Sequence, residues 1–214
     1  MSDYSGSAFE SAKRGAGALL SGALSALIVM VAMLAVMWFV EGVDFFLLDG
    51  SLDYEYGIIG WEPEGLTGII FAPFLHIGFG HLIANSLPLL VLGFFAGLRD
   101  IRKFLWATVL IIFIGGIGTW LTSPDIATVG ASGLVFGYFG FILARGLFDR
   151  RLLDIVIAIG VGVAYWGILA GLLPNQPGIS WQGHLFGLIG GVVAGWVLRR
   201  KRELPPATTY PYLS

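Results

Sequence analysis

The chain has 214 residues, of which 57% are apolar and 12% are charged, and its formal net charge is −2. A soluble domain of this size carries about twice that share of charged residues, so the composition excludes a soluble globular protein and indicates an integral membrane protein. The sequence contains no cysteine, which excludes disulfides, thiolate nucleophiles and cysteine metal ligands.

Six apolar stretches, separated by polar or charged residues, are predicted to be membrane-spanning helices. They cover residues 18–40, 79–98, 104–121, 131–145, 152–173 and 183–198. The first stretch lacks a small-residue cleavage pattern at its end, so it is predicted to be a retained anchor and not a signal peptide. Residues 18–202 therefore form one membrane domain, preceded by a short segment, residues 1–17, and followed by a proline-rich tail, residues 203–214.

The positions of the charged residues predict the orientation of the six helices. When the connections are assigned alternately to the two sides of the membrane, all twelve Lys and Arg residues fall on the side of the N-terminus. This side is the cytoplasm by the positive-inside rule, so both termini are expected to be cytoplasmic. The acidic and aromatic loop 41–65 is expected outside, partly in the membrane interface. The predicted fold class is an all-α membrane protein, a six-transmembrane-helix bundle that crosses the cell membrane several times.

Three polar side chains are predicted to lie at one depth, and a fourth, that of His81, about 6 Å nearer the outside. A helix rises about 1.5 Å per residue, so Ser132 lies about 20 Å from Arg145, the basic residue taken to end its span. The same estimate gives about 22 Å for His184 and about 21 Å for Asn85. His81 lies one turn before Asn85 on the same helix face. Because polar groups at this depth are costly unless they face water or the bundle interior, we expect these four residues to form the floor of a water-filled cavity open to the outside.

Glycines predict that two of the helices pack closely. They recur every four residues in the last span, at Gly183, Gly187, Gly191 and Gly195, and Gly133 and Gly137 form a similar stripe in the fourth span. Small residues let helix backbones approach each other. Gly130 and Gly133, on either side of Ser132, also allow close approach to its hydroxyl. We therefore expect the side chains of Ser132 and His184 to meet at hydrogen-bonding distance.

Ser132 and His184 could together perform nucleophilic catalysis. A serine hydroxyl becomes a good nucleophile when a base accepts its proton, and histidine is the usual base because its pKa lies near neutrality. The candidate carboxylates are expected elsewhere, Asp125 in an external loop and Asp149 and Asp154 on the cytoplasmic side. The sequence therefore predicts a catalytic dyad without a third member.

The oxyanion formed in such a reaction needs hydrogen-bond donors, which His81, Asn85 and the backbone N–H of Ser132 could supply. Each of these residues also has a structural interpretation. Ser132 could bond back to a carbonyl one turn earlier, and His184 and Asn85 could join helices by hydrogen bonds. His76 lies outside the depth cluster and is expected to bond loop backbone near a helix start. The catalytic interpretation is favoured because nucleophile, base and donors converge from three separate helices.

Three motifs occur in order along the chain: His76-x4-His81-x3-Asn85, then Gly130-x-Ser132-Gly133, then Gly183-His184 followed by Gly187 and Gly191. Over residues 66–199 this combination resembles the rhomboid family of intramembrane serine proteases. The resemblance implies a six-helix bundle of the rhomboid type in which Ser132 attacks, His184 is the general base, and His81 and Asn85 complete the oxyanion hole. It also implies cleavage of single-span membrane proteins near the outer end of their membrane segment, at small residues where the helix can unwind.

Two positions depart from the family pattern. The first loop contains Trp61-Glu62 and no Trp-Arg pair. One turn after the serine the family often has tyrosine, and here Phe136 can stack under the His184 ring but has no hydroxyl to donate.

The expected partners are transmembrane protein substrates and the lipid bilayer. We expect no cofactor, no metal and no nucleic-acid partner, and the sequence leaves the oligomeric state open. The alternative function is a catalytically silent rhomboid-like protein that binds membrane clients. A small transporter is disfavoured because the hydropathy pattern has no internal repeat.

Overall fold

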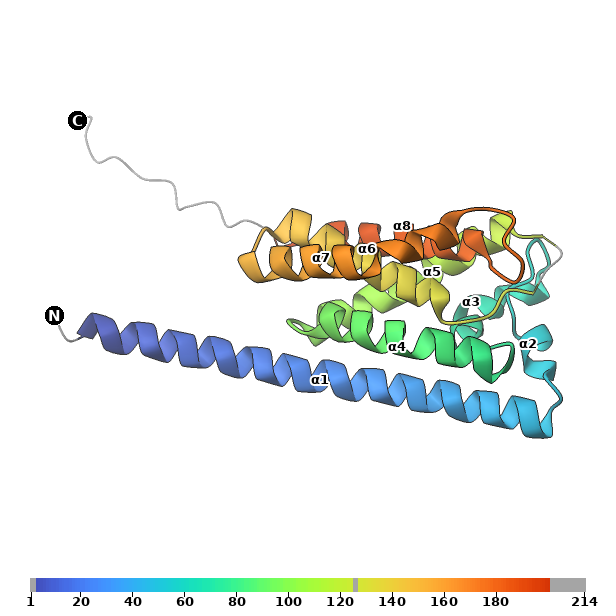
Figure 1. The fold of residues 1–214 in the computed structure, drawn as a ribbon, viewed down its shortest axis with the longest axis horizontal. Helices are drawn as coiled ribbons and strands as arrows, with labels where there is room; N and C mark the ends of the chain where they lie inside the picture. Colours follow the sequence, from blue (N-terminus) through green and yellow to red (C-terminus); the bar gives the residue numbers. More distant parts are fainter. Residues whose placement is uncertain (1–2, 125–126, 201–214) are drawn as a thin grey trace, which may run out of the picture.

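The structure is a computed structural model that describes residues 3–124 and 127–200, which form a bundle of helices joined by loops (Figure 1). The elements in chain order are α1 (Asp3–Leu47), α2 (Ser51–Glu55), η1 (Glu64–Leu66), α3 (Gly68–Phe71), η2 (Ala72–Phe74), α4 (Gly78–Gly97), α5 (Ile101–Thr122), α6 (Ser132–Asp149), α7 (Leu152–Tyr165), η3 (Trp166–Leu172) and α8 (Trp181–Val197). The predicted all-helical class is confirmed. The predicted tail, residues 203–214, and Asp125 lie outside the described residues.

Within residues 3–124 and 127–200, four helical segments are long and apolar enough to cross a membrane: Lys13–Leu47, Gly78–Gly97, Ile101–Thr122 and Leu152–Leu172. They correspond to the first, second, third and fifth predicted spans. The other two predicted spans form α6 and α8, which have 18 and 17 residues and carry glycines and polar groups within the bundle. The number of spans and the orientation therefore stay predictions.

The long helices run back and forth between two ends of the bundle (Figure 1). One end holds the start of α1, the α4–α5 and α6–α7 connections and the end of α8. We call it the basic end, because Arg99, Arg102, Lys103, Arg150, Arg151, Arg199 and Arg200 lie there. We call the opposite end the site end. It holds α2, α3 and the loops that precede α6 and α8. Helix α1 lies along α4 at the outside of the bundle.

Helix α1 is longer than the predicted span 18–40. It also contains residues 3–17, predicted as a separate segment, and residues 41–47, predicted as loop. Its 45 residues correspond to about 67 Å, more than twice the roughly 30 Å hydrocarbon core. The helix ends where Asp49 and Gly50 adopt left-handed conformations, with φ of 55° and 76°, and the Gly50 N–H donates to the Asp44 carbonyl at 3.2 Å. These conformations are typical of helix C-termini.

Two sets of contacts tie the first loop to the site end. Ile58 and Thr128 exchange both backbone hydrogen bonds, at 3.0 and 2.9 Å. The Trp61 indole donates to the Leu121 carbonyl at 3.0 Å, and the Trp120 indole donates to the Glu62 carbonyl at 2.9 Å. The loop is therefore fixed both to the end of α5 and to the segment that leads into α6.

The glycines of α8 face α6 at backbone contact. A Cβ atom at Gly187 would overlap the carbonyl oxygen of Gly133, and one at Gly191 would overlap that of Gly137. The predicted close packing of these two helices is therefore observed. Because the backbones themselves touch, α6 and α8 hold a fixed register, which sets the positions of the residues at their starts.

Replacing Gly191 by alanine is expected to destabilise the bundle. The new methyl group would force α6 and α8 apart, and such overpacking costs about 1–3 kcal/mol in a well-packed interior. Unfolding by SDS in detergent micelles measures the change. The matched control is Gly160→Ala in α7, where a Cβ would meet nothing within 4 Å and the gain in helix propensity should leave stability unchanged or higher. Equal effects of the two substitutions would contradict the packing argument.

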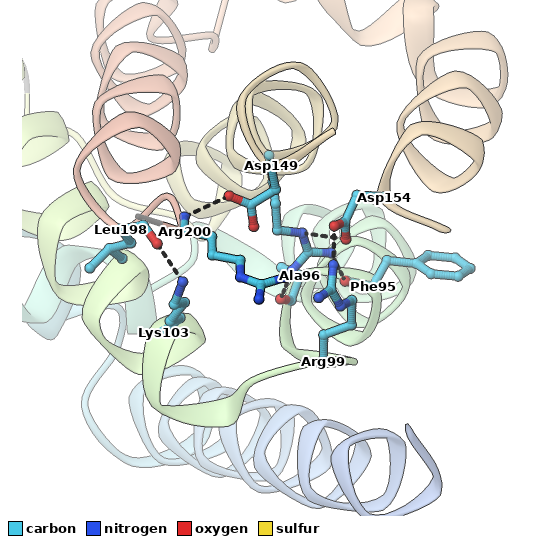
Figure 2. A network of polar contacts seen from close by, with 9 residues as sticks. Phe95, Ala96, Arg99, Lys103, Asp149, Asp154, Leu198 and Arg200 are labelled. Carbon is cyan, nitrogen blue, oxygen red and sulfur yellow. Dashed lines mark hydrogen bonds and ion pairs between the residues drawn. The ribbon is translucent and has the colours of Figure 1, made fainter. Parts of the chain in front are cut away.

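An ion cluster joins α4, α6 and α7 at the basic end (Figure 2). Arg145, only 7% exposed, donates to the carbonyls of Ala96 and Phe95 at 2.8 and 2.9 Å. Asp154, 1% exposed, pairs with Arg99 and lies 3.2 Å from Arg145 Nε. The fourth span is predicted to end at Arg145, but α6 continues to Asp149, and the Arg145 guanidinium is buried with two carbonyls as acceptors. Its distance from Ser132 therefore does not measure depth below a membrane surface.

Asp154→Asn is expected to lower the free energy of unfolding by about 3–5 kcal/mol, because removing one partner leaves buried charges without compensation. The control is Asp149→Asn, whose side-chain oxygen can still accept the Arg200 N–H that Asp149 accepts at 2.8 Å. It should change stability by less than about 1 kcal/mol. Thermal unfolding in detergent compares the two, and a small effect of Asp154→Asn would show that Arg99 and Arg145 find other partners.

Candidate active site

Ser132 is the first residue of α6 and follows a strained turn. Gly130 has φ of 118°, which a residue with a side chain rarely adopts, and its N–H donates to the Ala72 carbonyl at 2.9 Å. A Cβ at Gly130 would lie 2.6 Å from His81 Cε1. Glycine is therefore required here both for the backbone conformation and for the approach of His81. Ser132 sits at a helix start, where the first N–H groups have no partner within the helix.

His76 holds the segment before Ser132 in place. This residue lies in the connection between η2 and α4, is 1% exposed, and accepts a hydrogen bond from the Ala131 N–H at its Nε2, at 3.3 Å. Burial, and secondarily the neighbouring His81, lowers the pKa of His76 to about 3. The ring is therefore neutral near neutral pH and can act as the acceptor. It also packs edge-on against the His81 ring, with centroids 5.2 Å apart.

His184 lies in the first turns of α8, is 8% exposed, and is held on two sides. Its Nδ1 is 2.9 Å from the Gly171 carbonyl oxygen of η3. A carbonyl can only accept, so Nδ1 carries the proton and Nε2 is left as the acceptor. The ring stacks on Phe136 of α6, with centroids 4.2 Å apart and an angle of 11°. The imidazole is thus fixed in both tautomer and orientation.

The packing of α6 on α8 brings Ser132 and His184 into the same region. Their neighbours touch, since a Cβ built on Gly133 would lie 3.5 Å from the Gly183 carbonyl oxygen. Within residues 3–124 and 127–200, no hydrogen bond joins the Ser132 hydroxyl to His184. The expected hydrogen bond between the two side chains is therefore not formed in this structure, although the two helices that carry them are in contact.

The two predicted oxyanion donors lie on one face of α4. Asn85 is 7% exposed, and its Nδ2 donates to the His81 carbonyl at 3.2 Å. This bond uses one of the two amide N–H groups, so the other is chemically able to donate elsewhere. The His81 ring, in contrast, is partly exposed and lies against Gly130, two residues before Ser132.

Two cavities meet next to Ser132. The inner one has a volume of about 50 Å³, and Ser132, Gly133 and Gly183 are among its lining residues. The second, of about 510 Å³, is lined in part by His81. Thr128, Val129 and Ser180 line both. Ser132 lines the smaller cavity and His81 the larger, and neither cavity has His184 or Asn85 among its lining residues, so neither has the predicted floor of four residues.

A cysteine at position 128 should react with a membrane-impermeant thiol reagent, because Thr128 borders both cavities. The chain has no native cysteine, so the signal from Thr128→Cys would be unambiguous. Ala107→Cys is the control, since Ala107 is 0% exposed and should not react. Mass spectrometry of the intact protein measures the labelling. An unreactive cysteine at position 128 would mean that the space beside Ser132 is dry.

Two residues of the site were not foreseen. Ser180 lines both cavities and caps α8, since its Oγ accepts the Gly183 N–H at 3.2 Å. A serine three residues before the glycine stripe is a typical helix-start signal and could have been recognised. Gly171 contributes only a backbone carbonyl. A Cβ there would lie 2.8 Å from His184 Nδ1, but no sequence pattern marks a carbonyl that orients a distant ring.

The comparisons with known proteins agree on one protein family. The sequence model described as Rhomboid domain matches residues 63–201. Uncharacterized protein Rv1337 of Mycobacterium tuberculosis is 44% identical over 83% of this chain and 79% of its own length. A Bacillus subtilis protein named "Putative rhomboid protease YdcA" is 32% identical over 72% of this chain and 77% of its own length. RHOMBOID-like protein 4 of Arabidopsis thaliana is 31% identical over 70% of this chain and 37% of its own length.

Proposed function

This chain belongs to the rhomboid family of integral membrane proteins, and from that premise we propose that it is an intramembrane serine endopeptidase with a Ser132–His184 dyad. The observation that carries the proposal is the hydrogen bond between His184 Nδ1 and the Gly171 carbonyl. It leaves Nε2 of a buried, stacked imidazole as the atom able to accept a proton. Such a fixed imidazole, on a helix packed against the one that begins with Ser132, supports the assignment of His184 as the general base.

In the proposed topology, α1, α4, α5, α6, α7 with η3, and α8 cross the cell membrane, and the basic end faces the cytoplasm. The clustering of arginine and lysine at that end supports this orientation. Helices α6 and α8 are shorter than the other spans because they start below the outer surface, where loops and water cover the site. The dyad would then lie on the outer side of the bilayer.

In the proposed reaction, His184 Nε2 takes the hydroxyl proton while Ser132 Oγ attacks the carbonyl carbon of the scissile peptide bond. The tetrahedral intermediate collapses as His184 passes this proton to the leaving amine, and an ester joins Ser132 to the N-terminal part of the substrate. Water, deprotonated by His184, then hydrolyses the ester and restores both residues. No carboxylate is needed to accept the hydrogen bond of the His184 Nδ1–H, since the Gly171 carbonyl already accepts it.

Three groups are proposed to stabilise the oxyanion. The backbone N–H of Ser132 lies at the start of α6, where unpaired N–H groups and the helix dipole favour negative charge. The His81 ring, next to Gly130, and the second N–H of Asn85 would complete the donor set. Losing one such donor typically lowers the rate by about 10²–10³-fold.

The proposed substrates are single-span membrane proteins, cleaved near the outer end of their membrane segment. The cavity beside Ser132 supports a preference for small side chains. Its volume is about 50 Å³, against about 510 Å³ for the cavity that His81 lines. Its walls include Gly115, Gly116 and Gly133, so larger side chains at these positions would close it.

A second candidate is a catalytically silent rhomboid-like protein that binds membrane clients. It is favoured by one observation: within the part of the chain that the structure describes, the Ser132 hydroxyl makes no hydrogen bond to His184. Hydrogen bonds between nucleophile and base are, however, often long until substrate binds.

A serine-reactive fluorophosphonate probe separates the two candidates. The purified full chain is reconstituted in liposomes, treated with the probe, and in parallel incubated with a single-span reporter protein. The protease is expected to be labelled at Ser132 and to cut the reporter within or beside its membrane segment, as read by mass spectrometry. A silent client-binding protein would bind the reporter without labelling or cleavage.

A further inference from the structure

A third cavity lies at the basic end, which is the opposite end of the bundle from Ser132 and His184. Its volume is about 250 Å³, several times the roughly 30 Å³ share of a water molecule. Five cationic side chains line it: Arg99, Lys103, Arg145, Arg151 and Arg200. They come from the α4–α5 connection, α5, α6, the α6–α7 connection and the segment after α8. We call this space the basic cavity.

The carboxylates near the basic cavity are already engaged. Asp100 Oδ1 accepts the N–H groups of Arg102 and Lys103 at 3.0 and 3.1 Å, which caps α5. Asp149 Oδ1 accepts the Arg200 N–H at 2.8 Å. Asp154, behind the cavity, is shared by two guanidinium groups. Five cations against these three carboxylates give a net charge of +2, so the cavity attracts an anion.

Two of the cations are held in place before any ligand arrives. Lys103 Nζ donates to the Leu198 carbonyl at 2.6 Å, and Arg145 donates to two carbonyls at the end of α4. Figure 2 shows Lys103 beside Leu198 and Asp149 beside Arg200, with the cluster around Arg99 and Asp154 on the other side. Arg151 and Arg200 are exposed at the rim. The fixed cations lower the ordering cost of binding, because they lose little freedom when a ligand binds.

We propose that the basic cavity binds the phosphate group of an anionic phospholipid. Guanidinium groups match phosphate oxygens in pairs of hydrogen bonds. The cavity lies where transmembrane helices end, which is the level of lipid headgroups, and basic pockets between such helices bind acidic headgroups. A bound phosphate would bridge the ends of α5, α6 and α8, so the lipid would stabilise the helix pair that carries Ser132 and His184.

Thermal unfolding of the detergent-solubilised full chain tests the site. Short-chain phosphatidylglycerol is the probe, phosphatidylcholine of the same chain length is the uncharged comparison, and inorganic phosphate is the soluble source of the same group. Phosphatidylglycerol is expected to raise the unfolding temperature of the native chain in a saturable way, and phosphatidylcholine is not. Inorganic phosphate could also raise the unfolding temperature equally and compete with phosphatidylglycerol. This result would support a phosphate site but identify free phosphate, not lipid, as the ligand.

Two charge-matched double variants decide whether the effect is local. The double variant Arg151→Gln with Arg200→Gln removes two rim cations. It is expected to weaken phosphatidylglycerol binding at least about tenfold, which is the effect of losing one charge-assisted hydrogen bond. Arg102→Gln with Arg150→Gln removes two cations at the same end that do not line the cavity and should bind as the native chain does. Equal weakening in both double variants, or no shift with the native chain, would overturn the proposal. The readout needs no proteolysis, so it stands apart from the proposed protease activity.

Discussion

Replacing Ser132 by alanine is expected to abolish cleavage of a single-span reporter and labelling by a fluorophosphonate probe. The hydroxyl oxygen is the proposed attacking atom, and removing the nucleophile of a serine protease lowers kcat by about 10⁶-fold. The variant should fold normally, because within residues 3–124 and 127–200 the Ser132 side chain takes part in no hydrogen bond that would be lost. Reporter cleavage in liposomes and probe labelling followed by mass spectrometry measure the two losses.

Ser86→Ala is the matched control for this experiment. Ser86 is another serine in a long helix, whose hydroxyl donates to the Leu82 carbonyl at 2.8 Å and accepts from the Trp38 indole at 3.1 Å. The side chain is structural, so its removal should leave cleavage and labelling at Ser132 in place. Cleavage by the Ser132→Ala variant at the native rate would refute the assignment of the nucleophile.

His184→Ala is expected to lower cleavage as severely as Ser132→Ala, by about 10⁶-fold. Without the Nε2 acceptor, the serine proton has no base and the leaving amine has no acid. The Phe136 ring would lose its stacking partner, so thermal unfolding must accompany the activity measurement. The control is Gln182→Ala in the same helix, where only a side-chain hydrogen bond to the Thr122 carbonyl at 3.2 Å is lost. This control should keep most of the activity.

The double variant Ser132→Ala with His184→Ala tests whether the two residues act as one unit. Residues of a catalytic unit have strongly non-additive effects, so the double variant should be no slower than either single variant. A double variant that is slower than both by the product of their effects would mean that the two residues act independently. The dyad assignment would then be wrong even though each residue matters.

The long helices of this protein were predictable because each contains a continuous apolar stretch bounded by charges, glycine or proline. The short helices α2, η1, α3 and η2 were not predicted. The glycine stripes further predicted that α6 packs on α8, and the structure places Gly187 and Gly191 against α6 backbone. Helix boundaries were less predictable. Residues 41–47 contain acidic groups that suggested a loop, yet the helix continues through them until Asp49 and Gly50 turn it.

Arg145 illustrates why the depth of single residues was harder to predict. A basic residue near the end of an apolar stretch is usually an interfacial anchor. Here the guanidinium is buried, because Asp154 of another helix and two carbonyls of α4 supply its partners. Asp154 lies 9 residues after Arg145, and the two carbonyls lie about 50 residues before it. No local sequence pattern therefore predicts these contacts.

The sequence by itself determined the all-helical class and the rhomboid family and named the candidate site residues, since these depend on composition, periodicity and motif spacing. Only the tertiary structure decided which nitrogen of His184 is available, how the cavities divide around Ser132, and where the cations of the basic end converge. The physical reason is that each of these depends on contacts between segments distant in the chain. The Gly171 carbonyl contacts His184, the Ala131 N–H contacts His76, and the Asp154 carboxylate contacts Arg99. Each of these contacts depends on how the segments pack, which no local sequence pattern shows.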